Sequence, residues 1–157
     1  MKKGTEWIPS ELYIEIMNHL PICCVDIMIF NTERTKVLLC KRNNEPLKGE
    51  YFSPGGRLLK NEEPKNGATR QAKRELGITI DPEQIVFGGI INEVYPNSAF
   101  GKDIGYHAVV IYFGYVATKD INIILDNQHS DYKWFDVSDK TIHVCVQERI
   151  NTLIPKL

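Results

Sequence analysis

The chain has 157 residues, of which 43% are hydrophobic and 25% charged, and its formal net charge is −1 at pH 7. This length allows one domain with a sizeable core, so we expect a single domain over residues 1–157. A nearly neutral chain has no overall attraction for nucleic acid or membrane surfaces, so we expect neither partner, and any site for an anion must be built locally.

The first predicted element is a helix. Ser10 is a candidate N-cap, Leu12, Ile16 and Leu20 share one face, and Pro21 ends the helix. The next predicted elements are strands at residues 25–30 and 36–42, with a polar hairpin at residues 31–35 between them.

The middle of the chain is predicted to be a loop rich in glycine and proline, over residues 43–63, followed by a helix. Pro64 suits the first helical position, where its missing N–H costs nothing. Gly77 suits the left-handed residue that caps a helix ending at Leu76. The remaining predicted elements are strands at 85–94, 106–117 and 133–135, loops at 95–105 and 119–131, and a helix at 143–154. Strands and helices in this order indicate an α/β layered domain.

The cysteines Cys23, Cys24, Cys40 and Cys145 form no C-x-x-C pair. We interpret them as small buried residues of a reduced protein rather than as metal or redox groups. The lysines after Met1 precede no apolar segment typical of a signal peptide, and no apolar run is long enough to span a bilayer. We therefore expect a cytoplasmic location.

The segment GGRLLKNEEPKNGATRQAKRELGI, residues 55–78, is the most informative part of the chain. Ala68, Ala72 and Leu76 recur every four residues, so that face of the helix is predicted to pack inward. Gln71, Arg74 and Glu75 lie on other faces. A glycine loop beside such a helix can hold a hydrated Mg²⁺ and the phosphates that it bridges. An ordinary amphipathic helix with a solvated charged face is the alternative.

The spacing of Gly56, Glu62, Arg70, Glu75 and Gly77 closely resembles the Nudix box, G-x5-E-x7-R-E-U-x-E-E-x-G-U, where U is aliphatic. The resemblance implies an α/β/α sandwich with a mixed sheet. It also implies divalent-metal-dependent hydrolysis of a nucleoside diphosphate derivative, with Mg²⁺ as the cofactor, for which Mn²⁺ can substitute.

Two positions depart from the box, because Gln71 and Arg74 stand where the pattern has glutamates. Losing two carboxylates and gaining a cation weakens the attraction for metal, so one ion held partly by substrate phosphates is expected. The GDP-mannose mannosyl hydrolases, a Nudix group, have boxes reduced in the same places. Further likeness to this group lies in residues 20–31, 41–62 and 126–134.

This resemblance implies attack of water on the anomeric carbon of a GDP-sugar, most simply GDP-mannose, with release of GDP and free sugar. His129, in the run QHSDY, matches the general base. The metal ligands implied are Glu75, the carbonyl of Gly55 and the amide oxygen of Gln128. Gln128 is equally well interpreted as a plain loop residue.

Further roles are implied by the same resemblance. Arg42 and Arg57 match residues that bind the leaving diphosphate, a task that suits guanidinium groups. Asp26 lies in an apolar strand and matches a substrate-orienting residue, so it is counted with Arg42 as catalytic; a structural ion pair is its competing role. Trp7 is a candidate for stacking on guanine, or else a core or dimer contact. Glu62 and Arg70 are expected to support the loop and the helix.

Two other functions stay open. One is a Nudix pyrophosphohydrolase that splits the P–O–P bridge, and the other is a non-catalytic sensor of nucleotide sugars. The resemblance also implies a homodimer. The identity of the sugar is left open, and we expect the segment 92–104 to determine it.

Overall fold

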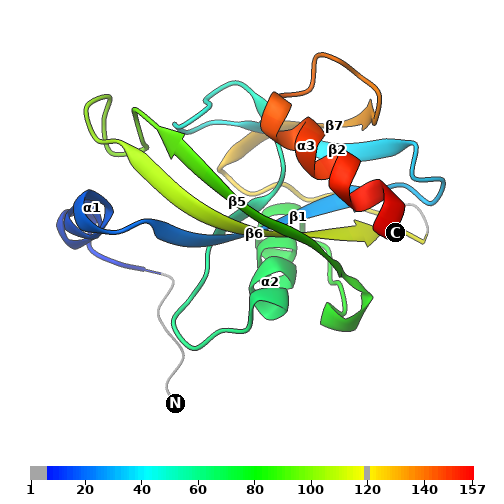
Figure 1. Cartoon of the computed structure of the whole chain (residues 1–157), viewed down its shortest axis with the longest axis horizontal. Helices are drawn as coiled ribbons and strands as arrows, with labels where there is room; N and C mark the ends of the chain where they lie inside the picture. Colours follow the sequence, from blue (N-terminus) through cyan, green and yellow to red (C-terminus); the bar gives the residue numbers. More distant parts are fainter. Residues whose placement is uncertain (1–6, 119–120) are drawn as a thin grey trace.

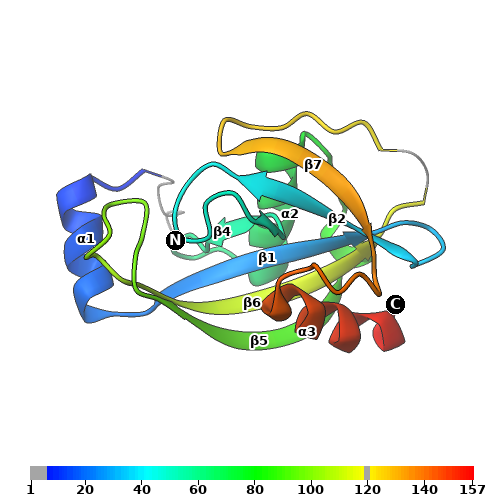
Figure 2. The same ribbon diagram turned by 90° about the horizontal axis from the view of Figure 1, so that it is seen from above.

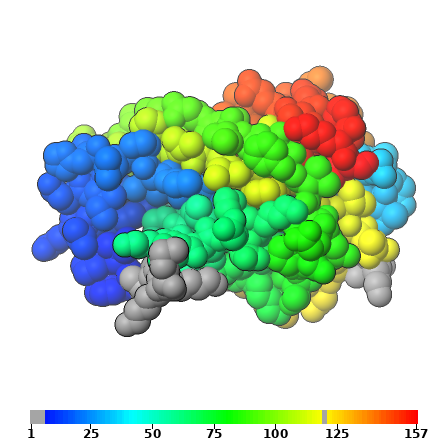
Figure 3. Space-filling model, turned by 60° about the horizontal axis from the view of Figure 1, so that its bottom comes forward, coloured from blue at the N-terminus to red at the C-terminus, as the bar shows by residue number. Residues whose placement is uncertain are grey.

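The computed structural model describes residues 7–118 and 121–157 of the chain. A mixed sheet lies between helix α2 on one face and helix α3 on the other (Figure 1, Figure 2). The space-filling view shows the N-terminal helix α1 and the C-terminal helix α3 at opposite ends of the molecule (Figure 3). In chain order the elements are α1 Ser10–His19, β1 Ile22–Phe30, β2 Lys36–Arg42, β3 Tyr51–Phe52, β4 Gly55–Arg57, α2 Pro64–Leu76, a 3₁₀ turn Pro82–Gln84, β5 Val86–Tyr95, β6 Tyr106–Val116, β7 His129–Asp136, α3 Val144–Leu153 and a 3₁₀ turn Ile154–Lys156.

Strand β1 occupies the centre of the sheet, whose order is β3-β2-β1-β6-β5. It pairs in parallel with β6 and antiparallel with β2 and with β4. Strand β7 pairs antiparallel with β2 along almost all of its length. The predicted α/β/α sandwich with a mixed sheet is therefore confirmed.

Helix α2 has the bounds that its terminal residues predicted. Pro64 is in its first turn, and Gly77 follows its end with φ 72°, in the left-handed region that favours glycine. Ala68, Ala72 and Leu76 are completely buried in the core between α2 and the sheet. This apolar face fixes the rotation of the helix about its axis, and so fixes where its polar side chains point.

Helix α1 packs on a face that shares Ile16, but not Leu12 or Leu20, with the predicted one. Leu12 and Leu20 are 53% and 61% exposed, whereas Met17, with Tyr13 and Ile16 beside it, packs on the sheet. A spacing of four residues turns by about 400°, so positions repeated at that spacing drift around the helix. Residues at i, i+3 and i+4 stay together better, and those are the positions that contact the sheet.

Several other boundaries differ from the prediction, including the start of β1, which is Ile22 instead of residue 25. Pro9, not Ser10, takes the N-cap position of α1. Strands β3 and β4 lie inside the segment 43–63, which was predicted to be a loop. Strand β7 is longer than the predicted 133–135, because backbone bonds to β2 form it while most of its side chains are exposed.

The cysteine prediction is confirmed in part. All four cysteines are free, and Cys24 and Cys40 are buried, but Cys23 is exposed and Cys145 is half-buried. Across residues 7–118 and 121–157, the helices are too short or too polar to cross a membrane.

The core between the sheet and α3 contains an arginine whose side chain is completely buried, Arg149. Its Nη1 donates to Asp26 Oδ2 at 2.6 Å and to Ser53 Oγ at 2.5 Å, and its Nη2 donates to Glu93. The guanidinium carbon also lies 5.0 Å from the ring centroid of Phe52. One cation from α3 therefore holds two buried carboxylates, one on β1 and one on β5.

We expect Arg149→Leu to lower the free energy of unfolding by about 3–5 kcal/mol, because two buried carboxylates would lose their counter-charge. Urea unfolding followed by circular dichroism measures this. Glu148→Leu is the matched control, since Glu148 is the exposed neighbour on the same helix, and its effect should stay within about 0.5 kcal/mol. Equal effects of the two substitutions would contradict the role given to Arg149.

Candidate functional site

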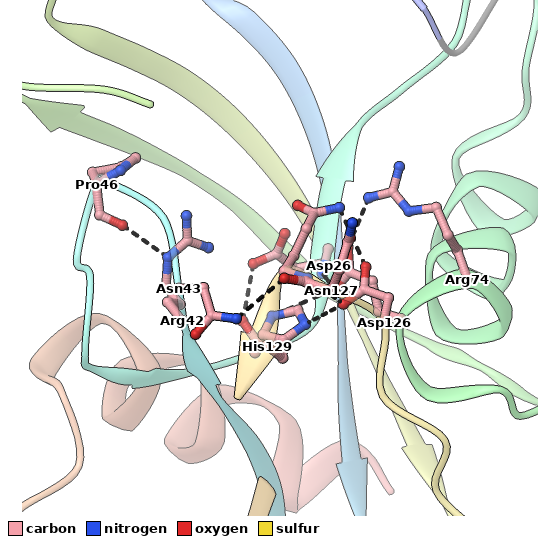
Figure 4. A network of polar contacts seen from close by, with 12 residues as sticks. Asp26, Arg42, Asn43, Pro46, Arg74, Asp126, Asn127 and His129 are labelled. Carbon is pink, nitrogen blue, oxygen red and sulfur yellow. Dashed lines mark hydrogen bonds and ion pairs between the residues drawn. The ribbon is translucent and has the colours of Figure 1, made fainter. Parts of the chain in front are cut away.

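Three segments far apart in the sequence meet at the end of α2: strand β4, the last turn of α2 and the start of β7 (Figure 4). The segment before β7 is tied to α2 by backbone bonds from Ile124 N to Leu76 O, at 2.9 Å, and from Asp126 N to Glu75 O, at 3.2 Å. On its other side Asn43 N donates to the carbonyl of Gln128 at 2.9 Å. These bonds set where the side chains of residues 126–129 point.

Strand β4 brings two glycines against the side chains of neighbouring elements. Gly55 pairs with Asp26 across β1 and β4, and a Cβ at Gly55 would lie 1.9 Å from Asp26 Oδ1. A Cβ at Gly56 would lie 2.6 Å from Gln71 Nε2. A Cβ at Gly55 would also lie 2.6 Å from the backbone carbonyl oxygen of Val25, so this close approach requires glycine at Gly55, whereas a Cβ at Gly56 would displace the end of the Gln71 side chain. As a result, the Gly55 N–H reaches Glu75 Oε2 at 3.1 Å.

Glu75 is the buried carboxylate of the site, with 1% of its surface exposed. Besides the Gly55 N–H on Oε2, it accepts a hydrogen bond from Arg74 Nη2 on Oε1 at 2.9 Å. Burial raises the pKa of Glu75 from 4.5 to about 7, and the positive charge of Arg74 opposes this rise. Burial therefore disfavours the ionised form of Glu75 overall, and Arg74 offsets only part of this effect.

His129 lies beside Glu75 at the first residue of β7 and is buried. Its Nδ1 is 3.0 Å from Asp126 Oδ1, and its Nε2 is 3.9 Å from Glu75 Oε2. Burial lowers the pKa of His129; hydrogen bonding to Asp126 opposes this, and the charges of Arg42 and Arg74 lower the pKa further. The imidazole is therefore neutral near pH 7, with its proton on Nδ1 toward Asp126 and its Nε2 lone pair directed at the site.

Asp126 is a site residue that the sequence analysis did not single out. It accepts hydrogen bonds from Gln128 N at 3.1 Å and from Gln128 Nε2 at 3.3 Å, in addition to its contact with His129. A carboxylate three residues before a candidate base was the available signal. Because the amide nitrogen of Gln128 turns toward Asp126, its amide oxygen is left to act as an acceptor.

The predicted diphosphate ligands Arg42 and Arg57 occupy different surroundings. Arg42, at the end of β2, is the register partner of His129, and its Nε donates to the carbonyl of Pro46 at 2.8 Å. The guanidinium carbon of Arg57, on β4, lies 6.0 Å from the ring centroid of Tyr13 on α1. Arg42 therefore faces His129, and Arg57 faces α1.

Glu62 and Arg70 connect the loop after β4 to α2. Arg70 donates through Nε to Glu62 Oε1 at 2.8 Å and through Nη2 to Glu62 Oε2 at 2.9 Å. The same Nη2 reaches the carbonyl of Arg57 at 3.1 Å, and Glu62 Oε2 also accepts from Leu59 N. These bonds hold the loop against the helix that carries Glu75.

A cavity of about 80 Å³ opens next to β4. Its polar lining includes Asp26, Arg42, Ser53, Glu93 and Tyr95. Ligand pockets commonly exceed about 300 Å³, so this cavity fits one end of a ligand rather than a whole nucleotide. Glu93 was missed because a single acidic residue in a predicted strand carries no pattern.

The other features predicted to bind substrate lie only partly at this cavity. Trp7 precedes α1 and is 72% exposed. Asp26 forms an ion pair with Arg149, which is the structural role that the sequence analysis gave as the alternative to substrate binding. Asp26 also lines the cavity. The segment 92–104 begins inside β5, and its loop places Phe100 against Tyr13, with ring centroids 5.5 Å apart.

Comparison with known proteins identifies the family to which the chain belongs. The family model described as the NUDIX domain matches residues 22–150. The low-salt glycan biosynthesis protein Agl8 of Haloferax volcanii is 32% identical over 151 residues, which cover 96% of this chain and 94% of that protein.

Two solved structures are similar in fold. The MutT NUDIX hydrolase from Burkholderia pseudomallei has a TM-score of 0.69 and 19% identity, over 86% of this chain and 99% of that one. The NUDIX domain of Shewanella oneidensis NrtR, complexed with ADP ribose, has a TM-score of 0.64 and 18% identity, over 92% of this chain and 97% of that one. The box predicted this relationship, and the match over residues 22–150 confirms it: the chain belongs to the Nudix hydrolase family.

Proposed function

We propose that the chain hydrolyses a nucleoside diphosphate sugar of the GDP-mannose type, releasing GDP and free sugar by attack of water on the anomeric carbon. The observation that carries this proposal is His129, buried beside Glu75, with Asp126 on one ring nitrogen and the other directed at the site. Such an arrangement suits a general base for water. The names of two relatives support the substrate class: one concerns glycan biosynthesis, and the other protein is bound to ADP ribose, a nucleoside diphosphate joined to a sugar.

The oxygen donors near Glu75 fit a hard divalent cation. Across the described part of the chain, no three side chains of the His, Cys, Asp and Glu types cluster as metal ligands, so protein carboxylates alone make no metal cage. However, Gln71 Oε1 is buried without a hydrogen-bond partner among the described residues, one turn before Glu75. Glu75, the Gly55 carbonyl and the Gln128 amide oxygen would hold Mg²⁺ or Mn²⁺ together with substrate phosphates. A bound cation supplies positive charge to the diphosphate leaving group.

His129 performs the proton transfer in the proposed reaction. Its Nε2 removes a proton from water as the water oxygen bonds to the anomeric carbon. The bond between that carbon and the phosphate oxygen breaks, and its electron pair leaves with GDP. Asp126 keeps the other proton on Nδ1 and stabilises the imidazolium that forms, and Arg42 stabilises the negative charge on GDP.

The substrate end that carries the sugar is assigned to the cavity beside β4. The carboxylates of Asp26 and Glu93 offer acceptors to sugar hydroxyl groups there, and the Ser53 hydroxyl donates to Asp26. Four further features stay predictions: the stacking of Trp7 on guanine, the binding of the diphosphate by Arg57, the homodimer and the cytoplasmic location.

Product analysis in ¹⁸O-labelled water tests the proposed reaction directly. With GDP-mannose and Mg²⁺, we expect the label on free mannose and none on GDP, because water attacks carbon. Mass spectrometry of the products measures this. Label on a phosphate, with release of GMP and mannose 1-phosphate, would instead establish pyrophosphohydrolase chemistry. Binding of several GDP-sugars without turnover would favour the sensor.

His129→Gln should lower kcat by about 10²–10⁴-fold, because the amide cannot accept the proton of water. GDP binding, measured by calorimetry, should change little, because glutamine keeps a side chain of similar size. The control is His107→Gln, since His107 lies on β6 and contacts Asn92 instead of the site. Turnover within a few-fold of wild type in the His129 variant would remove histidine from the mechanism.

The raised pKa of Glu75 predicts how Mg²⁺ stabilises the fold at different pH values. Glu75 ionises near pH 4.5 in the unfolded chain and near pH 7 in the folded one, so its burial destabilises the fold increasingly between these values, and fully above pH 7. A cation relieves this cost only when Glu75 is ionised. Mg²⁺ should therefore raise Tm more at about pH 8 than at about pH 5.5.

The matched variant is Glu75→Gln, which keeps the size of the side chain and removes its charge. In this variant the Tm increase caused by Mg²⁺ should be small and nearly the same at both pH values. An undiminished, pH-dependent increase in the variant would show that the cation binds elsewhere.

A further inference from the structure

A second cavity, of about 200 Å³, lies at the end of the molecule where α1 is found. Three segments border it: α1, the loop between β2 and β3, and the loop between β5 and β6. Figure 1 and Figure 2 show α1 and the last of these loops at the same end of the molecule. Pro46 and Tyr106 line both this cavity and the one beside β4, so the two cavities are neighbours. The proposed reaction leaves the second cavity without a role.

Aromatic rings form one wall of the second cavity. The rings of Tyr13 and Phe100 lie with their centroids 5.5 Å apart and their planes at 59°, and the Tyr13 hydroxyl shares a hydrogen bond with that of Tyr106. The loop holds Phe100 in place, because Ser98 Oγ accepts from Phe100 N at 3.2 Å and backbone bonds join Ser98 to Gly101. Such a wall suits a flat ring, which stacks on aromatic side chains.

The second cavity also borders the residues that are proposed to hold the diphosphate. Gln128, whose amide oxygen is proposed to hold the cation, is one of its lining residues, whereas Arg42 lines the cavity beside β4. A nucleoside diphosphate sugar has its diphosphate in the middle, so its sugar and its nucleoside leave the phosphates in different directions. With the sugar in the cavity beside β4, the second cavity is the neighbouring space for the nucleoside.

Glu45 gives the second cavity a half-buried carboxylate. Its Oε2 accepts a hydrogen bond from Lys48 N at 3.3 Å within the loop between β2 and β3. An ionised carboxylate only accepts hydrogen bonds, so it binds a base edge that carries donors. Guanine has two adjacent donors, N1–H and the 2-amino group, whereas adenine presents the lone pair of N1 at the same edge. The carboxylate therefore favours guanine and repels adenine.

We propose that the second cavity is a nucleobase subsite, in which the ring stacks on Phe100 and Tyr13 and Glu45 selects guanine by accepting from N1–H and the 2-amino group. The inference rests on the proposed function, because the ligand is taken to be a nucleoside diphosphate sugar. It adds the residue that selects the base. It also divides the segment 92–104 between the two ends of the substrate, because Glu93 lines the cavity beside β4 and Phe100 lines the second one.

Binding of uncleavable analogues to the whole chain tests this inference. Calorimetry with Mg²⁺ present measures Kd for α,β-methylene GDP, for α,β-methylene ADP and for methylenediphosphonate, which has no base. The variants are Glu45→Gln and Phe100→Ala. Glu50→Gln is the matched control, because it removes the same charge from an exposed residue of the same loop that lines neither cavity.

We expect wild type to bind the GDP analogue about tenfold or more tightly than the ADP analogue, and Glu45→Gln to lose most of this preference, because its amide has one acceptor and places a donor against the base. Glu50→Gln should keep the preference. Phe100→Ala should weaken both nucleotide analogues about tenfold and change the affinity for methylenediphosphonate less than about twofold, because stacking depends on the base.

A preference for GDP that persists in Glu45→Gln would overturn the inference, as would a wild type that binds both nucleotides equally. An equal loss for all three ligands in Phe100→Ala would also contradict the stacking role. Circular dichroism shows which variants are folded, and the Glu45 comparison suffices if Phe100→Ala is not. Because the analogues cannot be cleaved, these outcomes do not depend on the bond that the chain breaks, which the labelled-water experiment decides.

Discussion

The absence of side chains at Gly55 and Gly56 sets how closely β4 can approach both β1 and α2. A Cβ at either position would overlap the side chain of Asp26 or Gln71. At the observed spacing, the Gly55 N–H contacts Glu75 and closes the space around it. Burial raises the pKa of Glu75, and the hydrogen bond from Gly55 that this approach allows lowers it, as the charge of Arg74 does. The backbone of β4 is therefore as much a part of the site as the ionisable side chains.

Two groups of charges lie on opposite faces of the sheet. On the α2 face, Glu75 is paired with Arg74. On the α3 face, Asp26 and Glu93 are paired with Arg149, where β1 also contributes Met28 and Phe30 to the core. Gly55 lies against a carboxylate of each group. Strand β4 therefore lies between the two groups of charges and contacts both.

Much of the fold was predictable where local chemistry marks the ends of elements. Pro64 and Gly77 defined α2, and the run of residues 36–42 defined β2. The length of β7 was not predictable, because its pairing uses backbone groups and its side chains are mostly exposed. The packed face of α1 was also missed, since an exposed Leu12 and a buried Met17 are equally apolar.

The site residues likewise divide into those that a local sequence pattern marks and those that it does not. The box spacing located Glu75, and the QHSDY run located His129, because both are local patterns. The roles of Asp126, Glu93 and Arg149 depend on contacts made in three dimensions, and no spacing marks them. Arg149 lies 123 residues after Asp26, so no local pattern could have joined the two.

The distance along the chain between Arg149 and its carboxylates has a consequence for synthesis. A growing chain contains Asp26 and Glu93 well before it contains Arg149, which follows them by 123 and 56 residues. Until α3 is synthesised, the two carboxylates lack the counter-charge that Arg149 supplies. The charged groups around the cavity can therefore take their final arrangement only once α3 is present. A product truncated before α3 would contain Asp26 and Glu93 without that counter-charge.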